Sequence, residues 1–328
     1  MSLGVQADWK HFLEQRAFVV RDSSGTQRAF SASPAAAANA RCVDLNHLAT
    51  LRLVGSDAAT FLQGYLTCDM TALGPAQAQW GAYCNIKGRV VADATVVLTE
   101  GHPTLVVHGT LRDTVIESLR KYLAFSRSRF APADAAPILL GLIEPEDPAL
   151  PSEPLTVLPF RGGCAVAVPG SPRRVMLLLP VADARATWLE YEARGETGDA
   201  NAWDLHDVRA GIAHVTQATS ESFLPQMLDY DQLGAVSFTK GCYLGQEIVA
   251  RTQHRGQPKR HLHRLRWNGT PMPAAGETLL GADDRSVGTL VNAAAIDASS
   301  GDALAVLSDG VGGPLHAGGV QFALQQLS

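Results

Sequence analysis

The sequence lacks the features of a membrane-embedded or secreted protein. Its longest strongly apolar run covers only residues 175–181, far short of the roughly 20 residues that a membrane helix needs. The opening stretch MSLGVQADWK has no basic segment followed by an apolar one, which argues against a secretory signal. Charged residues make up 18% and hydrophobic residues 46% of the chain, as in ordinary globular proteins. We therefore expect a soluble, cytoplasmic protein with a sizeable core.

Cysteine is scarce and scattered. The chain has five cysteines, and no two of them form a CxxC pair, so no single segment offers a ready-made zinc or iron–sulfur cradle. An odd number of widely spaced cysteines fits reduced thiols, and a lone cysteine is most often a small buried hydrophobe. We expect no permanently bound metal. The five are Cys42, Cys68, Cys84, Cys164 and Cys242.

Positive charge is in deficit over the chain but concentrated in one place. The net charge is −5, which argues against a dedicated nucleic-acid-binding protein. Residues 240–266, however, carry seven Lys or Arg residues against Glu247 alone. Such a stretch can attract a polyanion even on an acidic protein. The alternatives are a solvated face or a subunit contact.

Apolar periodicity in the first half of the chain predicts one α+β module at residues 41–143. The order strand–helix–strand–strand–helix–strand is that of a ferredoxin-like unit. Ser56 and Asp57 offer N-cap chemistry for the first helix, and Thr110 with Asp113 resembles a capping box for the second. Residues 23–40 are small and polar without a clear period, which indicates a loose segment. The expected elements are a strand at 48–54, a helix around 61–66, strands at 94–98 and 104–108, a helix at 110–123 and a strand at 138–143.

The second half of the chain predicts a second α+β module at 144–256 and a small all-β module at 257–328. Residues 144–154 are rich in Pro and Glu and mark the first boundary. Beyond residue 257, short apolar runs alternate with turns rich in Gly, Pro and Asp, which is typical of a small β module. The two α+β modules can interleave in sequence. The second is expected to contain strands at 164–168 and 175–179 and helices at 183–194 and 201–210.

The segment 236–251 carries the most suggestive chemistry. Apolar residues lead into a Lys240-Gly241 turn, and a short helix is expected to run from Tyr243 to Arg251. Cys242 would then lie near the N-terminus of that helix, where backbone N–H groups and the helix dipole favour a thiolate. Lys240 would add positive charge. This arrangement suits a nucleophile or a metal ligand; the alternative is a buried structural thiol.

The run KGCYLGQE resembles the KGCYxGQE motif of the YgfZ family, which belongs to the folate-binding glycine cleavage T-protein superfamily and is related to mitochondrial iron–sulfur assembly factors. Similarity extends over residues 45–264 and includes the segments 85–89 and 121–126. The resemblance implies an α+β fold with three domains in a ring around a folate-sized channel: two α+β, ferredoxin-like modules and a small C-terminal β-barrel. The matching motif residues are Lys240, Gly241, Cys242, Tyr243, Gly245, Gln246 and Glu247, followed by Arg251.

The resemblance also implies a cofactor, tetrahydrofolate or a derivative. Trp203 stands eight residues before Gly211, where YgfZ proteins place a folate-contacting tryptophan, so we expect its ring to floor the channel. The alternative is a core tryptophan on an amphipathic helix. Lys240, Gln226 and Asp93 are further candidates for polar contacts to the cofactor.

Two departures from the T-protein pattern count against a glycine-cleavage enzyme. T-proteins carry a paired Asp-Asp in the strand after the Gly-rich turn, and this chain has Ala92-Asp93 instead. They also carry a glutamate where this chain has Arg209. We therefore expect Asp93 not to act as a catalytic base.

The resemblance favours an accessory protein that binds folate and supports the assembly or repair of iron–sulfur enzymes, including those that modify tRNA. Cys242 is the predicted essential group, as a transient cluster ligand or a redox thiol. A partner must supply any other cluster ligands, so iron–sulfur proteins, assembly factors and tRNA or tRNA-modifying enzymes are the expected partners. One alternative is a folate-dependent aminomethyltransferase or demethylase that uses Asp93. Another is a tRNA-binding module that uses residues 251–266.

Overall fold

A computed structural model describes residues 5–16, 40–132, 136–256 and 258–325 of the chain. These residues form two compact units, which are described separately. The first unit comprises residues 1–63, 69–80 and 94–203, and the second comprises 64–68, 81–93 and 204–328. Most of the expected loose segment, residues 23–39, lies outside the described part. Within that part, no helix is long and apolar enough to cross a membrane.

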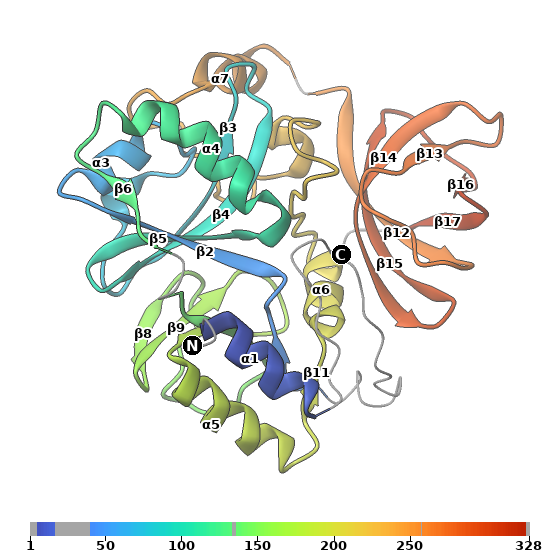
Figure 1. Cartoon of the computed structure of the whole chain (residues 1–328). Helices are drawn as coiled ribbons and strands as arrows, with labels where there is room; N and C mark the ends of the chain where they lie inside the picture. The colour runs from blue at the N-terminus through green and yellow to red at the C-terminus, as the bar shows by residue number, and fades with distance from the viewer. Residues whose placement is uncertain (1–4, 17–39, 133–135, 257, 326–328) are drawn as a thin grey trace. The chain divides into compact units, whose positions relative to one another are not determined.

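The first unit contains a six-stranded sheet, to which the strands labelled β8, β9 and β11 in Figure 1 belong. Its strands follow the order β11-β1-β7-β10-β9-β8. Neighbours are antiparallel except for β1 and β11, which are parallel. β1 and β7 come from the expected first α+β module and the other strands from the expected second one, so the sheet combines segments of both. The strands are β1 (Cys42–Asp44), β7 (Ile138–Ile143), β8 (Val157–Phe160), β9 (Gly163–Val168), β10 (Arg174–Leu179) and β11 (Thr197–Gly198).

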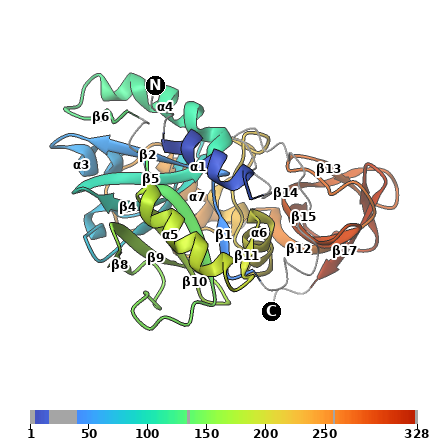
Figure 2. The ribbon, with the colours of Figure 1, turned by 60° about the horizontal axis from the view of Figure 1, so that its bottom comes forward.

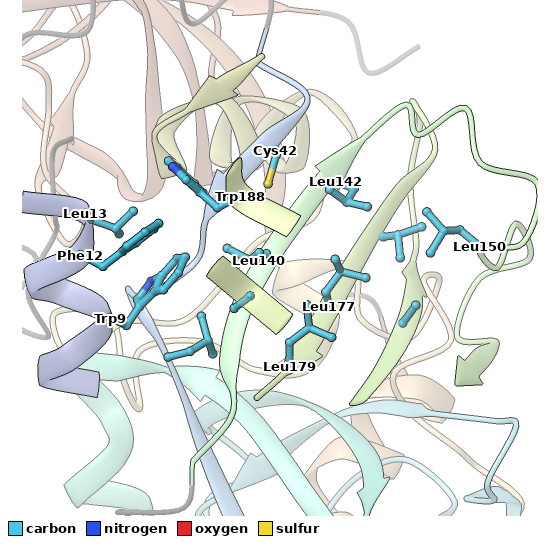
Figure 3. Close-up of a cluster of buried hydrophobic side chains, with 14 residues drawn as sticks. Trp9, Phe12, Leu13, Cys42, Leu140, Leu142, Leu150, Leu177, Leu179 and Trp188 are labelled. Carbon is cyan, nitrogen blue, oxygen red and sulfur yellow. The ribbon is translucent and has the colours of Figure 1, made fainter. Parts of the chain in front are cut away.

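Both faces of this sheet are buried, which explains its continuous apolar strands. Val175, Leu177 and Leu179 alternate along β10 and belong to the core cluster drawn in Figure 3, since successive side chains of a strand point to opposite faces. The helices α1 (Val5–Glu14) and α5 (Val181–Glu192) contribute Trp9 and Trp188 to the same cluster. The two helices lie side by side (Figures 1 and 2). The sequence patterns had not predicted α1.

A second sheet has the strand order β3-β4-β5-β2-β6. Its strands are β2 (Leu48–Val54), β3 (Gln79–Cys84), β4 (Val90–Thr99), β5 (His102–His108) and β6 (Arg129–Phe130), and the helical segments beside them in sequence are α3 (Ala58–Gln63), η1 (Met70–Ala72), η2 (Gly109–Leu111) and α4 (Arg112–Leu123). The expected capping box is wrong, because α4 has Leu111 as its N-cap and no side-chain cap. The backbone N–H of Thr110 instead donates to His108 Nδ1 (3.3 Å). Asp57 was expected to offer N-cap chemistry, and its carboxylate accepts hydrogen bonds from the hydroxyl groups of Ser126 and Ser128 and from the backbone N–H of Arg127.

The second unit contains a closed barrel with the strand order β12-β15-β14-β13-β16-β17 (Figure 1). Leu265, Trp267 and Leu307 are among the side chains that fill its core. The expected α+β class with a small C-terminal barrel is confirmed. The barrel strands are β12 (Arg260–Asn268), β13 (Thr278–Leu280), β14 (Ser286–Asp297), β15 (Ser300–Ser308), β16 (Leu315–Ala317) and β17 (Val320–Gln325). The helical segments of this unit are η4 (Pro225–Leu228), α7 (Gln246–Arg255) and the part of α6 (Ala200–Arg209) that begins at residue 204.

Candidate functional site

The KGCYLGQE motif forms a loop that ends at the start of α7. Cys242 lies in this loop and is exposed. The helix begins at Gln246, with Gly245 as its N-cap, and not at Tyr243 as the sequence pattern suggested. Cys242 therefore lies four positions before the first residue of the helix and not at its N-terminus as expected. What the structure provides at Cys242 is access.

Lys240 connects the motif loop to the segment at residues 66–68. Its side chain is buried, and Nζ donates hydrogen bonds to the backbone oxygens of Leu66 and Cys68, both at 2.7 Å. Nζ also lies 5.3 Å from the ring centroid of Tyr243, within the range of a cation–π contact. A buried ammonium group is costly unless it is hydrogen-bonded, and these contacts meet that need. Lys240 Nζ, which was predicted to contact the cofactor, thus has a structural role in the protein.

Gly245 allows the motif to pack directly on the turn between β3 and β4. Its φ is +84°, and a Cβ at this position would lie 2.4 Å from the backbone oxygen of Asn85 and 3.0 Å from Cα of Gly88. The Asn85 side chain holds the turn together, because Oδ1 accepts from the backbone N–H groups of Lys87 (2.9 Å) and Arg89 (3.1 Å). Only glycine fits such an approach at low cost. The motif loop and this turn therefore form one rigid support.

The remaining motif residues also have structural partners. Tyr243 is buried. Glu247 and Arg251 form an exposed i,i+4 ion pair of 2.6 Å, which contributes little to stability on a helix surface. Gln226, a predicted polar contact from η4, is buried and donates from Nε2 to the backbone oxygen of Val249 (2.7 Å). Its Oε1 has no partner among the described groups.

Asp93 belongs to a cluster that the sequence did not reveal. The backbone N–H of Val215 donates to Oδ1 (2.8 Å), and His214 Nδ1 lies 2.7 Å from Oδ2. The other ring nitrogen of His214, Nε2, lies 3.5 Å from a carboxylate oxygen of Asp207. The side chain of Asn292 fixes the backbone of His214, because it accepts from its N–H and donates to its carbonyl oxygen.

The charges of this cluster set its ionisation. Burial alone would raise the pKa of Asp93, but the charge and hydrogen bond of His214 and the Val215 N–H outweigh it and lower the pKa. Burial alone would lower the pKa of His214, yet Asp93 and Asp207 hold that pKa well above its usual value. Both shifts favour the charged forms, so Asp93 and His214 form an ion pair, and the carboxyl group of Asp207 lies beside the other ring nitrogen. No short motif marks it, since Asp93 and His214 are 121 positions apart.

Trp203 lies in the first unit, whereas Cys242, Lys240, Gln226 and Asp93 lie in the second. Its side chain belongs to the core cluster on the second face of the six-stranded sheet and is 5% exposed. A Cβ on Gly141 of β7 would lie 2.5 Å from the indole, so the ring packs closely against that backbone. The guanidinium of Arg174 lies 4.7 Å from the ring centroid. These contacts favour the alternative of a core tryptophan, and its role toward folate stays a prediction.

Arg251 and Arg266, two cations of the basic stretch 240–266, have carboxylate partners within the second unit. Arg266 and Arg209 both contact the buried carboxylate of Asp302, each at 2.9 Å. Arg264 donates to the backbone oxygen of Arg209 (3.0 Å), and Arg251 pairs with Glu247. Arg209, which replaces the T-protein glutamate, thus holds the end of α6 to the barrel strand β15.

The chemistry available to the site centres on one thiol. Three cysteines are buried, Cys164 is partly buried, and Cys242 is exposed. Burial raises the pKa of Cys164 to about 11 and that of Cys84 to about 12, which makes both poor nucleophiles. In the described residues, no group of three or more His, Cys, Asp or Glu side chains could hold a metal ion.

Comparison with known proteins places this geometry in context. Residues 23–144 match the family described as the GCVT N-terminal domain. The chain is 31% identical over 278 residues to the tRNA-modifying protein YgfZ of Yersinia pseudotuberculosis, covering 80% of this chain and 84% of that protein. It is 30% identical over 290 residues to the tRNA-modifying protein YgfZ of Sodalis glossinidius, with 81% and 84% covered. The structure resembles the glycine cleavage system aminomethyltransferase T of Bartonella henselae with a TM-score of 0.75, 16% identity, and 97% and 96% of the two chains covered. This last likeness concerns the fold alone.

Proposed function

Because the chain belongs to the YgfZ family, we propose that it is a cytoplasmic accessory protein that supports iron–sulfur enzymes, among them enzymes of tRNA modification, through the thiol of Cys242. The names of its relatives support a connection with tRNA modification. The observation that carries the proposal is the exposure of Cys242 on a rigid support. Lys240, Tyr243 and Gly245 are all used to build that support, which leaves the thiol as the accessible reactive group of the motif.

A single thiol defines what the protein can do. Cys242 can supply one ligand to a cluster or one sulfur to a thiol–disulfide exchange, and it cannot hold a cluster alone. A partner protein must therefore provide the remaining ligands. This chemistry suits an accessory factor that acts transiently on a client.

The alternative of an aminomethyltransferase or demethylase receives no support from Asp93. A general base needs an accessible carboxylate within reach of the proton that it takes. Asp93 is buried, and both of its oxygens are bound by His214 and Val215. Its charge is already compensated by the imidazolium. We therefore keep the accessory role as the proposal.

Tetrahydrofolate or a derivative is the cofactor that we propose, and the T-protein-like fold supports it. Each side chain predicted to contact it has protein partners: Trp203 is packed in a core, and Lys240, Gln226 and Asp93 are hydrogen-bonded to protein groups. Binding can be measured by quenching of tryptophan fluorescence with tetrahydrofolate, in the wild type and in Trp203→Phe. A higher apparent dissociation constant in the variant keeps Trp203 as a contact, and an unchanged constant removes it.

The central test is complementation of a bacterial strain that lacks its own YgfZ protein. The readout is the amount of tRNA nucleoside whose modification depends on an iron–sulfur enzyme. Wild type and Cys164→Ser should restore it, and Cys242→Ser should not. Cys164 is the matched control because it is a partly buried thiol outside the motif. Full restoration by Cys242→Ser would contradict the proposal.

A further inference from the structure

The end of α4 and the strand β6 that follows it carry four positively charged side chains. Arg120 and Lys121 belong to the last turn of α4. Arg127 and Arg129 come next, the latter on β6. All four are exposed, and no Asp or Glu stands between residues 118 and 130. Among the residues that the structure describes, none of the four is part of an ion pair, so their charges are available to an anionic ligand.

Phe125 stands between these two pairs of cations in the sequence and is 94% exposed. A single exposed apolar side chain is common on protein surfaces, so the exposure alone indicates little. Phe125 differs because its ring is almost entirely in water and has cations without ion-pair partners on both sides of it in the chain. An aromatic ring among cations is the combination with which proteins bind single-stranded nucleic acids.

Hydrogen bonds fix the backbone on both sides of Phe125. Its N–H donates to the carbonyl oxygen of Tyr122 (3.1 Å), which continues the turn of α4. After Phe125, Asp57 Oδ2 accepts from the hydroxyl of Ser126 (3.0 Å) and from the backbone N–H of Arg127 (2.9 Å). The segment is thus held in one conformation, which lowers the entropic cost of binding a ligand.

The cations and the ring lie in one region of the first unit. Lys121 precedes Phe125 by four positions, the spacing of neighbours on a helix surface. The elements α4 and β6 contact each other (Figure 1), and only residues 124–128 separate them in sequence. The α4–β6 surface, as it is called below, consists of Arg120, Lys121, Phe125, Arg127 and Arg129.

Positive charge on the α4–β6 surface exceeds the negative charge of the acidic residues beside it. Asp57 binds the loop within this surface, and Glu117 lies one turn before Lys121 on α4. With both counted, four cations face two anions. Lys121 Nζ also lies 4.9 Å from the ring centroid of Tyr122, a contact that leaves its charge in place. A local excess of this kind attracts a polyanion even on a chain whose net charge is −5.

We propose that the α4–β6 surface binds an unpaired stretch of RNA, with one base stacked on Phe125 and neighbouring phosphates beside the four cations. The proposal rests on the proposed function, which makes tRNA the RNA in question, and adds that this chain contacts the tRNA itself. Every base has an aromatic face that can stack on a phenyl ring, and unpaired bases are the ones free to leave their own stack. The basic stretch 240–266 suits this role less well, because Arg251 and Arg266 already have carboxylate partners.

The test measures how a fluorescently labelled single-stranded RNA of about 12 nucleotides binds to the purified chain at several salt concentrations. Phe125→Ala should raise the dissociation constant about tenfold, because the base loses the ring on which it stacks. The slope of log affinity against log salt concentration should stay the same in this variant. That slope should become shallower by about 0.7 in Arg127→Ala and by the same amount in Arg129→Ala, since each variant loses one phosphate contact.

Leu189→Ala and Arg194→Ala are the matched controls. Leu189 is a large apolar side chain of the same unit that is 41% exposed. Arg194 is an exposed cation of that unit, 3.7 Å from Glu196. Neither control should change the binding of RNA. Phe125→Ala should unfold at the temperature of the wild type, because its ring contacts little of the protein, and both should bind a blunt-ended RNA duplex equally.

Four results would overturn the proposal. The first is that the wild type does not bind the RNA, and the second is that Phe125→Ala binds it equally well. The third is a shallower slope in Lys259→Ala with unchanged slopes in Arg127→Ala and Arg129→Ala, which would assign the RNA to the stretch 251–266. The fourth is that Phe125→Ala binds RNA normally but fails in the complementation strain, which would assign the surface to a protein partner.

The Cys242→Ser variant separates this proposal from the proposed function. It should bind RNA like the wild type and fail to restore the modified nucleoside. If Cys242→Ser restores the nucleoside while Phe125→Ala loses RNA binding, the proposed function fails and the RNA surface stands. If Cys242→Ser fails to restore it while Phe125→Ala binds RNA like the wild type, the RNA surface fails and the proposed function stands.

Discussion

Replacing Asp93 by asparagine should show that this carboxylate balances a charged histidine. The amide would retain the shape of the side chain and could still accept from the N–H of Val215, but the change would remove the negative charge 2.7 Å from His214 Nδ1. A hydrogen bond to a charged group contributes about 1.5–3 kcal/mol. The His214 side chain is 34% exposed, so solvent screens part of the interaction, and Asp207 remains. We therefore expect a loss near the lower end, about 1.5 kcal/mol in the free energy of unfolding, or roughly 2 °C in Tm for a chain of this size.

The loss should depend on pH in a defined direction. The folded pKa of His214 is raised, so its contribution is complete below the unfolded value of about 6.5 and is lost as pH rises through the folded value. The folded pKa of Asp93 is lowered, so its contribution is complete above about 3.9 and is lost as pH falls through the folded value. The difference between wild type and Asp93→Asn should thus be largest between roughly pH 4 and 6.5.

The assay is urea unfolding from pH 4.5 to 9, with Asp309→Asn as the control. Asp309 also faces a histidine, His261, at 3.4 Å, but its carboxylate is 60% exposed, so its removal should change stability by less than about 0.5 kcal/mol. A difference for Asp93→Asn that stays constant across this range, or that is no larger than the control, would refute the reasoning.

Three further predictions concern the motif. Lys240→Met leaves two buried carbonyl oxygens without their donor and should cost about 2–3 kcal/mol in urea unfolding, whereas Lys259→Met at an exposed position should be nearly neutral. Gly245→Ala places a Cβ 2.4 Å from a backbone oxygen at a φ of +84°, so it should lower the free energy of unfolding by about 2 kcal/mol or more, which a measurement of Tm would detect. Gly241→Ala, whose Cβ would meet no atom within 4 Å, should leave Tm unchanged. In iodoacetamide labelling followed by mass spectrometry, Cys242 should react fastest of the five cysteines because it alone is exposed, and a slower reaction than any of the other four would remove it as the accessible thiol.

The sequence predicted what depends on neighbouring residues. The strand expected at 138–143 is β7, and the helix expected at 183–194 is α5 at Val181–Glu192, because periodicity and Gly195 are local signals. Cys242, which the motif singled out as the predicted essential group, is exposed and not the buried structural thiol that was the alternative; its role stays a prediction. The role of Lys240 was out of reach, because its acceptors Leu66 and Cys68 are 174 and 172 positions away.

The missed residues share the same cause. His214 and Asp207 have no pattern of their own, and they acquire meaning only when α6, β4 and the loop after Gly211 fold together. The burial of Trp203 depends on Gly141 and Arg174 from two strands. Non-local contacts of this kind leave no trace in a window of ten or twenty residues.

The support of Cys242 is assembled from three separate stretches of the chain. Residues 64–68 and 81–93 come from the N-terminal half, yet they belong to the unit that begins again at residue 204. A fragment that starts at residue 204 would lack the carbonyl acceptors of Lys240 and the turn on which Gly245 rests. Transplanting the eight motif residues into another protein would likewise transfer a cysteine without the conformation that exposes it. The motif and its support therefore cannot be moved to another protein as one continuous segment. Gene duplication or fusion could reuse them only by including both halves of the chain.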